Sequence, residues 1–202
     1  MRLFYSSGAC SLSPHIVARE AGIELDLQKV DLKTKTMVSP GDYLAVNPKG
    51  SVPALQLDDG EILTEGPVIV QYLADLRPEK GLAPAAGTLD RYRLQEWLGY
   101  INSELHKSFS PLFRPDTPAE TRAERQAYLN RRYTHIEQRL AQHPYLMGAA
   151  FTVADAYLFT VTNWAGIVKL DLSPFPKLRA FQERIAARPA VKAAMSAEGL
   201  LQ

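Results

Sequence analysis

The single cysteine of this 202-residue chain, Cys10, lies where its thiol could take part in chemistry. The apolar run from Leu3 to Tyr5 predicts a buried strand, and the Ser-Ser-Gly that follows breaks it. Ser13-Pro14 then predicts a helix N-terminus, with serine as N-cap and proline at the first helical position. Orphan amides and the helix dipole favour a thiolate in such a strand-to-helix turn. We therefore expect the pKa of Cys10 to lie below the free value of about 8.5, although a lone cysteine is more commonly a small buried hydrophobe.

A second group of residues could recognise an amino-acid end. Val52-Pro53 precedes a short apolar segment, and a cis bond there would turn the main chain of Val52 outward to pair with an extended peptide. Glu65 and Gly66 open the next helix, so Glu65 can bind an ammonium group and the Gly66 amide a carboxylate. The alternative is that Glu65 only complements the helix dipole.

A third group follows one face of a long amphipathic helix. Polar residues recur there at three- and four-residue steps, apart from the apolar face. Such a stripe is usually only solvated, but here it can line a binding cleft. A histidine in it can donate a hydrogen bond to a thiolate or act as acid or base, because its unperturbed pKa is near 6.5. The stripe comprises Gly99, Asn102, Ser103, His106 and Ser110.

The elements that must position the first two groups alternate between strand and helix. Asp59-Gly60 between short apolar segments is typical of a tight β-hairpin. The resulting order βαβαββα is that of the thioredoxin fold. After the first strand and helix we expect a strand at 25–32, a loop at 33–42, a helical turn at 43–46, a hairpin at 54–63 and a helix from 68 to 77.

The remainder of the chain predicts helices only, which makes the fold class α/β plus all-α. Thr117-Pro118-Ala119-Glu120 and Thr152-Val153-Ala154-Asp155 are capping-box patterns, so Asp155 is assigned a structural role. The segment after Asp155 is apolar nearly all round and belongs at the centre of a domain. We expect a thioredoxin-like domain at 1–78, a linker at 79–87 and an all-helical domain at 88–202, with helices near 90–113, 119–142, 153–164, 175–188 and 190–197.

Composition restricts the function classes. A net charge of +1 gives no electrostatic case for nucleic acid or an anionic membrane. One cysteine excludes an internal disulfide, and no apolar segment is long enough for a signal or a membrane span, so we expect a soluble cytoplasmic protein. His15, His135 and His143 show no ligand spacing, so we expect no metal. Glycine-rich phosphate loops are absent, so we expect no nucleotide.

Five motifs, spread over essentially the whole chain, resemble those of the bacterial beta-class glutathione transferases. Cys10 together with Glu104-Leu105-His106-Lys107 is similar to the beta class specifically, whereas Val52-Pro53 and the Thr152/Asp155 box suggest only the wider superfamily. The motifs are Gly-Ala-Cys-Ser-Leu-Ser (8–13), Asn-Pro-Lys-Gly-Ser-Val-Pro-Ala-Leu (47–55), Leu-Thr-Glu-Gly-Pro (63–67), Glu-Leu-His-Lys (104–107) and Phe-Thr-Val-Ala-Asp-Ala-Tyr (151–157).

The resemblance implies a glutathione-binding site, a small electrophilic second substrate and a homodimer. Cys10 would face the glutathione sulfur, with which this class can form a mixed disulfide. Many relatives carry serine at the position of Gly66, and close relatives carry asparagine at that of Gly99, so two side-chain contacts are lost or replaced. The implied roles are main-chain pairing for Val52-Pro53, the γ-glutamyl end for Glu65 and Gly66, the glycyl end for Lys35, and the helical-domain side of the site, partly across the dimer, for Gly99, Ser103, Glu104 and His106.

Three functions fit these features. The first is a transferase that lowers the thiol pKa of glutathione and places an electrophile beside it. The second is glutaredoxin-like thiol-disulfide chemistry through Cys10. The third is a non-catalytic interaction protein on the same fold, against which Cys10, Glu65 and His106 argue. Tyr5 and Ser11 are rivals for the thiol-activating role, but Tyr5 is expected to pack in its strand and Ser11 to cap the helix.

Overall fold

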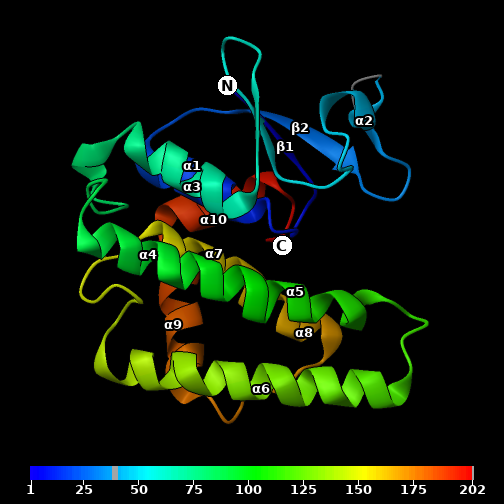
Figure 1. Cartoon of the computed structure of the whole chain (residues 1–202), viewed down its shortest axis with the longest axis vertical. Helices are drawn as coiled ribbons and strands as arrows, with labels where there is room; N and C mark the ends of the chain where they lie inside the picture. Colours follow the sequence, from blue (N-terminus) through cyan, green and yellow to red (C-terminus); the bar gives the residue numbers. More distant parts are fainter. Residues whose placement is uncertain (38–40, 202) are drawn as a thin grey trace. The chain divides into compact units, whose positions relative to one another are not determined.

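The computed structural model describes residues 1–37 and 41–201 and divides into two compact units. The first unit combines Met1–Ala83 with the C-terminal segment that begins at Ala187, and the second is Pro84–Ala186. Figure 1 shows the sheet with its helices and the helical unit in the colours of the sequence. Among the helices of the described residues, none is both long and apolar enough to cross a membrane.

The first unit is built on a five-stranded sheet in the order β3-β2-β1-β4-β5. The central strand β1 pairs parallel with β2, where Leu3 lies opposite Leu27, and antiparallel with β4, where Leu3 lies opposite Leu55. β4 and β5 form the hairpin that Asp59-Gly60 predicts. The strands are β1 (Arg2–Tyr5), β2 (Asp26–Asp31), β3 (Thr36–Met37), β4 (Ala54–Gln56) and β5 (Ile62–Thr64).

Helices cover this sheet. α1 packs against both α3 and α10, which lie beside it in Figure 1. Ile16 and Val17 of α1 are fully buried, and Phe4, Tyr43 and Val52 belong to one apolar cluster of the unit. The thioredoxin-like prediction for this part of the chain is thus confirmed. Its helices are α1 (Leu12–Ala21), α2 (Tyr43–Val46), α3 (Gly66–Asp75), the 3₁₀-helix η1 (Pro78–Lys80) and α10 (Pro189–Ala197).

Residue Glu198, just after α10, ties the C-terminal segment to the first unit. Its buried carboxylate lies 3.0 Å from Nδ1 of His15 and accepts a hydrogen bond of 3.0 Å from the backbone amide of Gly8. Arg188 also forms two bonds, of 2.6 and 2.8 Å, with Glu20 of α1. The predicted division placed this segment in the helical domain 88–202. The compact units differ from that division because these contacts join α10 to α1.

The second unit is entirely helical in its regular structure. All ten residues of α7 are buried, as its apolar sequence predicts. Thr152 and Asp155 form the predicted capping box at its N-terminus. The unit contains α4 (Leu89–Tyr100), the π-helix η2 (Ile101–His106), α5 (Lys107–Phe109), the 3₁₀-helix η3 (Ser110–Phe113), α6 (Ala119–Gln142), α7 (Val153–Thr162), α8 (Trp164–Val168) and α9 (Pro176–Ala186).

Two predicted helix caps are wrong. α1 begins at Leu12 with Ser11 in the N-cap position, so Ser13-Pro14 lies inside its first turn. The capping box at Thr117 does not form, because its hydroxyl donates to the carbonyl of Pro111 and Pro118 takes the N-cap position of α6. In both cases a serine or threonine hydroxyl that sequence alone assigns to a cap bonds another group.

Two further elements depart from the expected pattern. The sequence predicts a loop at 33–42, but this segment contains the short strand β3, which pairs with β2 at Val30 and Asp31. Residues 38–40 of the segment lie outside the described residues. The expected continuous helix from 90 to 113 changes to a π-helix at Ile101 and to a 3₁₀-helix at Ser110. π-Helical turns inside longer helices occur frequently at functional sites.

Candidate active site

The turn that carries Cys10 is held by hydrogen bonds of its own. The amide of Ala9 donates to the carbonyl of Ser6 at 3.0 Å. The buried Ser11 hydroxyl accepts from the Ser6 amide at 3.1 Å and donates to the Ser6 carbonyl at 3.2 Å. Ser11 is therefore occupied in shaping the turn, and it makes no side-chain capping bond to α1. Tyr5 is buried in β1, as expected for a strand residue.

The thiol of Cys10 meets the main chain of Val52. Its Sγ donates a hydrogen bond of 3.1 Å to the Val52 carbonyl oxygen. The predicted cis bond between Val52 and Pro53 is confirmed. Pro53 is itself buried and lies next to Gly66, the first residue of α3. Cys10, Val52, Pro53 and Gly66 are thus brought together within the first unit.

Burial raises the pKa of Cys10 to about 12. The amides of Cys10 and Ser11 act in the opposite direction but more weakly, and the charge of Glu65 raises the pKa further. The residue keeps some exposed surface, yet its sulfur is enclosed by protein, and the enclosure of the sulfur decides its ionisation. The predicted lowering is therefore wrong. α1 begins only at Leu12, and a thiol that donates to a carbonyl is stabilised in its protonated form.

Glu65 stands at the start of α3 in an unusual backbone conformation. Its φ of 69° and ψ of 111° lie in a region that non-glycine residues seldom adopt, at a typical cost of about 1–3 kcal/mol. Its side chain makes no capping bond. Instead, the exposed carboxylate pairs with the ammonium of Lys49 at 2.7 Å, and the same ammonium bonds the Thr64 hydroxyl at 3.0 Å. Strained residues of this kind cluster at binding sites.

Side chains that sequence reasoning did not single out shape the segment before Val52. The Ser51 carbonyl accepts hydrogen bonds from the Tyr43 hydroxyl at 2.7 Å and from the Asn47 amide at 2.8 Å. Lys35, which the resemblance did single out, reaches the same segment, where its ammonium donates to the Gly50 carbonyl at 2.6 Å. In the sequence, the Asn-Pro-Lys-Gly turn at 47–50 is the pattern from which Asn47 and Lys49 could have been predicted to shape this segment.

In the second unit, a chain of hydrogen bonds starts at His106. Its Nδ1 lies 2.7 Å from the hydroxyl of Tyr157, and that hydroxyl donates to Oδ1 of Asn102 at 2.9 Å. The imidazole also packs edge to face against Trp164 at a centroid distance of 4.8 Å. Phe109 and Phe113 contact the same indole ring. A polar, proton-bearing group thus adjoins an aromatic cluster.

The other predicted residues of this unit are engaged with one another. The Ser103 hydroxyl donates to the carbonyl of Gly99 at 3.0 Å. The Glu104 carboxylate accepts from the Tyr128 hydroxyl and pairs with Arg132 at 3.1 Å, so its charge is balanced within the unit. Arg132 also lies over the ring of Tyr128. These partners of Glu104 come from α6, about 25 residues along the chain, and nothing in the sequence near Glu104 indicates them.

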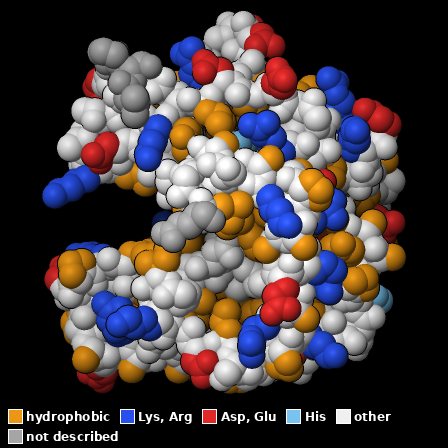
Figure 2. Space-filling view, turned by 180° about the vertical axis from the view of Figure 1, so that it is seen from behind, with side chains coloured by type: hydrophobic (Ala, Val, Ile, Leu, Met, Phe, Trp, Pro, Cys, Tyr) orange, Lys and Arg blue, Asp and Glu red, His pale blue; other side chains and the backbone are white. Residues whose placement is uncertain are grey.

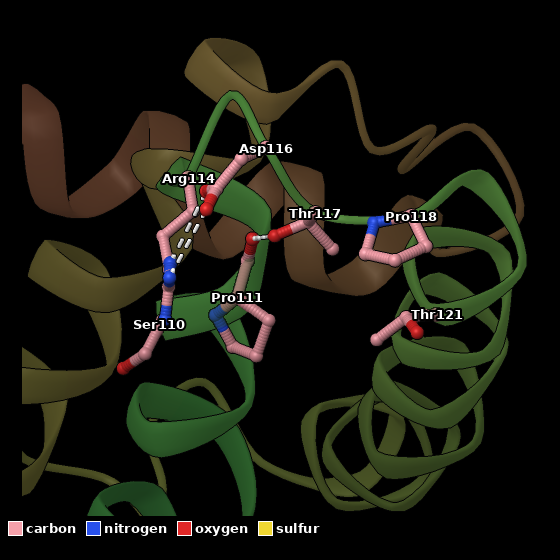
Figure 3. Close-up of a pocket in the computed structure, with 7 residues that line it drawn as sticks. All are labelled: Ser110, Pro111, Arg114, Asp116, Thr117, Pro118 and Thr121. Atoms are coloured by element: carbon pink, nitrogen blue, oxygen red, sulfur yellow. Dashed lines mark hydrogen bonds and ion pairs between the residues drawn. The ribbon is translucent and has the colours of Figure 1, made fainter.

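One hollow of the helical unit lies elsewhere. Figure 3 shows a pocket of about 430 Å³ at the end of η3, in which Arg114 pairs with Asp116 and Thr117 bonds the main chain of Pro111. Of the predicted polar stripe, only Ser110 lines this pocket, and the pocket's two charges, on Arg114 and Asp116, neutralise each other. Figure 2 shows acidic and basic side chains interspersed over one face of the molecule, as expected for a net charge of +1. Within residues 1–37 and 41–201, no group of three or more His, Cys, Asp and Glu side chains is placed to hold a metal ion.

Comparisons with known proteins match both parts of the chain to one family. Residues 8–76 match the model "Glutathione S-transferase, N-terminal domain", and residues 100–189 match "Glutathione S-transferase, C-terminal domain". Glutathione S-transferase GstA of Escherichia coli O157:H7 is 50% identical over 200 residues, which is 99% of this chain and 100% of that protein.

Solved structures agree with these matches. A sphingomonad glutathione S-transferase complexed with glutathione is 47% identical, with a TM-score of 0.96 and full coverage of both chains. The bacterial beta class glutathione S-transferase of Sphingomonas chungbukensis is 46% identical, again with a TM-score of 0.96 over both full chains.

Proposed function

Because this chain belongs to the glutathione S-transferase family, in its bacterial beta class, we propose that it binds glutathione along Cys10, Val52 and Glu65 of the first unit. It is an enzyme that transfers glutathione, its co-substrate, to a second substrate. The hydrogen bond between the Cys10 thiol and the Val52 carbonyl carries the proposal. It shows that the Cys10 donor lies beside the extended main chain of Val52, and the thiol of glutathione can lie between the two.

Each end of glutathione has a matching group in the first unit. The main chain of Val52 pairs with the cysteinyl part of the tripeptide, as an added strand would. Glu65 takes the γ-glutamyl ammonium, and the amide of Gly66 at the start of α3 takes the carboxylate beside it. Lys35, held near Gly50, supplies positive charge for the glycyl carboxylate.

Cys10 then acts as a hydrogen-bond donor. With its pKa raised to about 12, it is protonated at neutral pH. Its S–H turns from the Val52 carbonyl to the glutathione sulfur and stabilises the thiolate there, which lowers the pKa of glutathione's own thiol. Thiol-disulfide exchange through Cys10 remains a side activity in this proposal, and it is slow because the attacking species is the thiolate.

The second substrate is a small hydrophobic electrophile. Phe109, Phe113 and Trp164 form an aromatic cluster beside His106, and Phe113 is 43% exposed, so a planar apolar molecule has a surface to pack on. His106 supplies the acid or base of this site. Gly99, Ser103 and Glu104 complete the helical side of the site, partly across a homodimer, as in the resemblance from which their roles come.

The proposal is tested by removing Glu65. In Glu65→Ala, loss of a charge-assisted bond to the ammonium should weaken glutathione binding about tenfold, less than at a buried site because Glu65 is more than half exposed. Calorimetric titration measures the affinity, and conjugation of a halonitroarene measures the activity.

Lys49 offers a matched control for Glu65. Its ammonium occupies the carboxylate that the ligand needs, so Lys49→Gln should leave glutathione affinity unchanged or strengthen it by up to about fivefold. Unchanged affinity in Glu65→Ala would leave Glu65 without a part in recognition. Weakening by Lys49→Gln would instead make Lys49 a ligand-binding group.

We further propose that the protein is a twofold homodimer. Leu89 and Tyr92 on α4 are 69% and 58% exposed, and Val68 on α3 is 46% exposed, which favours an apolar interface. Sedimentation equilibrium at low micromolar protein should show the dimer, and a Leu89→Lys/Tyr92→Lys variant should be monomeric. Ile167→Lys, which changes an exposed apolar residue of α8, is the control and should remain dimeric. A monomeric parent protein with full activity would contradict the proposal.

We also retain the predicted cytoplasmic location as part of the proposal. The cytoplasm maintains a reducing glutathione pool, which provides the co-substrate in its thiol form. A chain with one cysteine needs no oxidising compartment to fold. Cell fractionation with an antibody against the chain would test this location.

A further inference from the structure

The hydroxyl of Tyr157 connects two polar side chains of η2. On one side it lies 2.7 Å from Nδ1 of His106, and on the other it is 2.9 Å from Oδ1 of Asn102. The phenol ring belongs to the fully buried helix α7 and is 1% exposed, so its position is set by the core of the unit. His106 and Asn102 are four residues apart in the π-helical segment, which presents both to the same hydroxyl.

The direction of these bonds follows from the number of protons. A phenol has one proton to donate, and Oδ1 of Asn102 can only accept. The proton of Tyr157 therefore points to Asn102, and the bond to His106 requires a proton on Nδ1 of the imidazole. In the neutral ring, Nε2 is then the nitrogen that carries the lone pair.

We propose that Tyr157 is a positioning residue of the transferase reaction, which holds neutral His106 in the Nδ1–H tautomer and so makes Nε2 a proton acceptor. The step rests on the proposed role of His106 as the acid or base of the site. The proton that the thiol of glutathione gives up in the reaction is taken up at Nε2, which leaves a thiolate and an imidazolium. The Nδ1–H bond to Tyr157 is kept throughout this transfer, so the ring does not have to turn.

The tautomer is measured directly by ¹⁵N NMR of the histidine rings in the complete protein. Wild type should show a protonated, pyrrole-type Nδ1 and a pyridine-type Nε2 for His106, whose signals are assigned by their loss in His106→Asn. His15, whose Nδ1 lies 3.0 Å from Glu198, gives an internal reference. In Tyr157→Phe, which keeps the buried ring, the His106 signals should shift toward the Nε2–H form. An Nε2–H tautomer in wild type, or no shift in Tyr157→Phe, would overturn the proposal.

Kinetics separate positioning from a merely structural effect. Tyr157→Phe should lower kcat about two- to tenfold, the value of one hydrogen bond, and leave the KM for glutathione unchanged. Asn102→Asp keeps an acceptor and should keep the wild-type tautomer, whereas Asn102→Leu should behave as Tyr157→Phe. Tyr133→Phe removes another buried hydroxyl of the unit, bonded to Thr162, and should leave the tautomer and kcat unchanged.

A second variant distinguishes failure of this inference from failure of the proposed function. If His106→Ala retains full kcat, His106 has no part in the reaction and Tyr157 has nothing to position, even where NMR shows the Nδ1–H tautomer. If His106→Ala is impaired, Tyr157→Phe should add no further loss in the double variant, because both changes remove the same proton acceptor. Additive losses would overturn the proposal, since the two residues would then act independently.

Discussion

Alkylation of Cys10 by iodoacetamide at pH 7.5 should be about a hundredfold slower in the folded protein than in the same chain unfolded in urea. A rise of the thiol pKa from its free value to about 12 lowers the thiolate fraction at this pH by roughly three orders of magnitude. The more basic thiolate is also the better nucleophile, which restores a factor of several tens. Because the chain has one cysteine, mass spectrometry reads the rate of Cys10 alone.

The pH dependence of alkylation provides the sharper test. The rate in the folded protein should still be rising at pH 10, whereas the unfolded chain should level off near pH 9 as its thiol ionises. Oxidised glutathione should likewise react more slowly with the folded protein than with the unfolded chain, and it should form a single adduct on Cys10. A folded-state rate that equals or exceeds that of the unfolded chain would restore the low-pKa interpretation, and with it a fast thiol-disulfide activity.

The second large effect concerns stability. Asp155→Ala should lower the free energy of unfolding by about 3–5 kcal/mol, because three buried donors lose their acceptor. The carboxylate accepts from the amides of Leu146 and Thr152, both at 2.8 Å, and from the Thr152 hydroxyl at 3.0 Å. Urea unfolding measures the change. Asp171→Ala is the control: its exposed carboxylate bonds Ser173 in a similar local pattern, and its loss should change stability by less than about 1 kcal/mol.

The pKa of Asp155 makes the size of this loss depend on pH. Burial raises the pKa of its carboxyl to about 6 from 3.8, against the weaker opposite effect of its hydrogen bonds. A raised pKa in the folded state means that the contribution of the group is full below about pH 4 and declines as pH rises through 6. The loss caused by Asp155→Ala should therefore be larger at pH 4 than at pH 7. A loss that grows with pH would show that the carboxylate is instead stabilised in its charged form.

Local signals in the sequence predicted the parts of the fold that depend on neighbouring residues. The hairpin around Asp59-Gly60, the cis bond at Val52-Pro53 and the capping box of α7 are each decided within about four residues, and each is present. The buried helix α7 is predicted for the same reason, because its apolar residues cover every face.

Features that depend on distant partners could not be predicted in this way. The pKa of Cys10 is raised by burial and further by the charge of Glu65, which is distant in the sequence, so a helix-terminus argument gives the wrong sign. Thr117 has two possible partners, and the carbonyl of Pro111 is the one it bonds. The partners of Glu104 lie on another helix. The roles of Lys35, Glu65 and His106 in binding remain predictions, because they concern a ligand.

The hydrogen bond from the amide of Gly8 to Glu198 joins the two ends of the chain within the sheet unit. This unit is therefore formed from two stretches that are separated in the sequence. The helical unit is an insertion between the first 83 residues and the C-terminal segment. During synthesis the ribosome therefore releases the Cys10 turn early, but the carboxylate that closes it emerges nearly two hundred residues later. The helical unit can fold before the unit that begins the chain is complete. Vectorial synthesis thus completes the segment that carries the Cys10 thiol last, although that segment is made first.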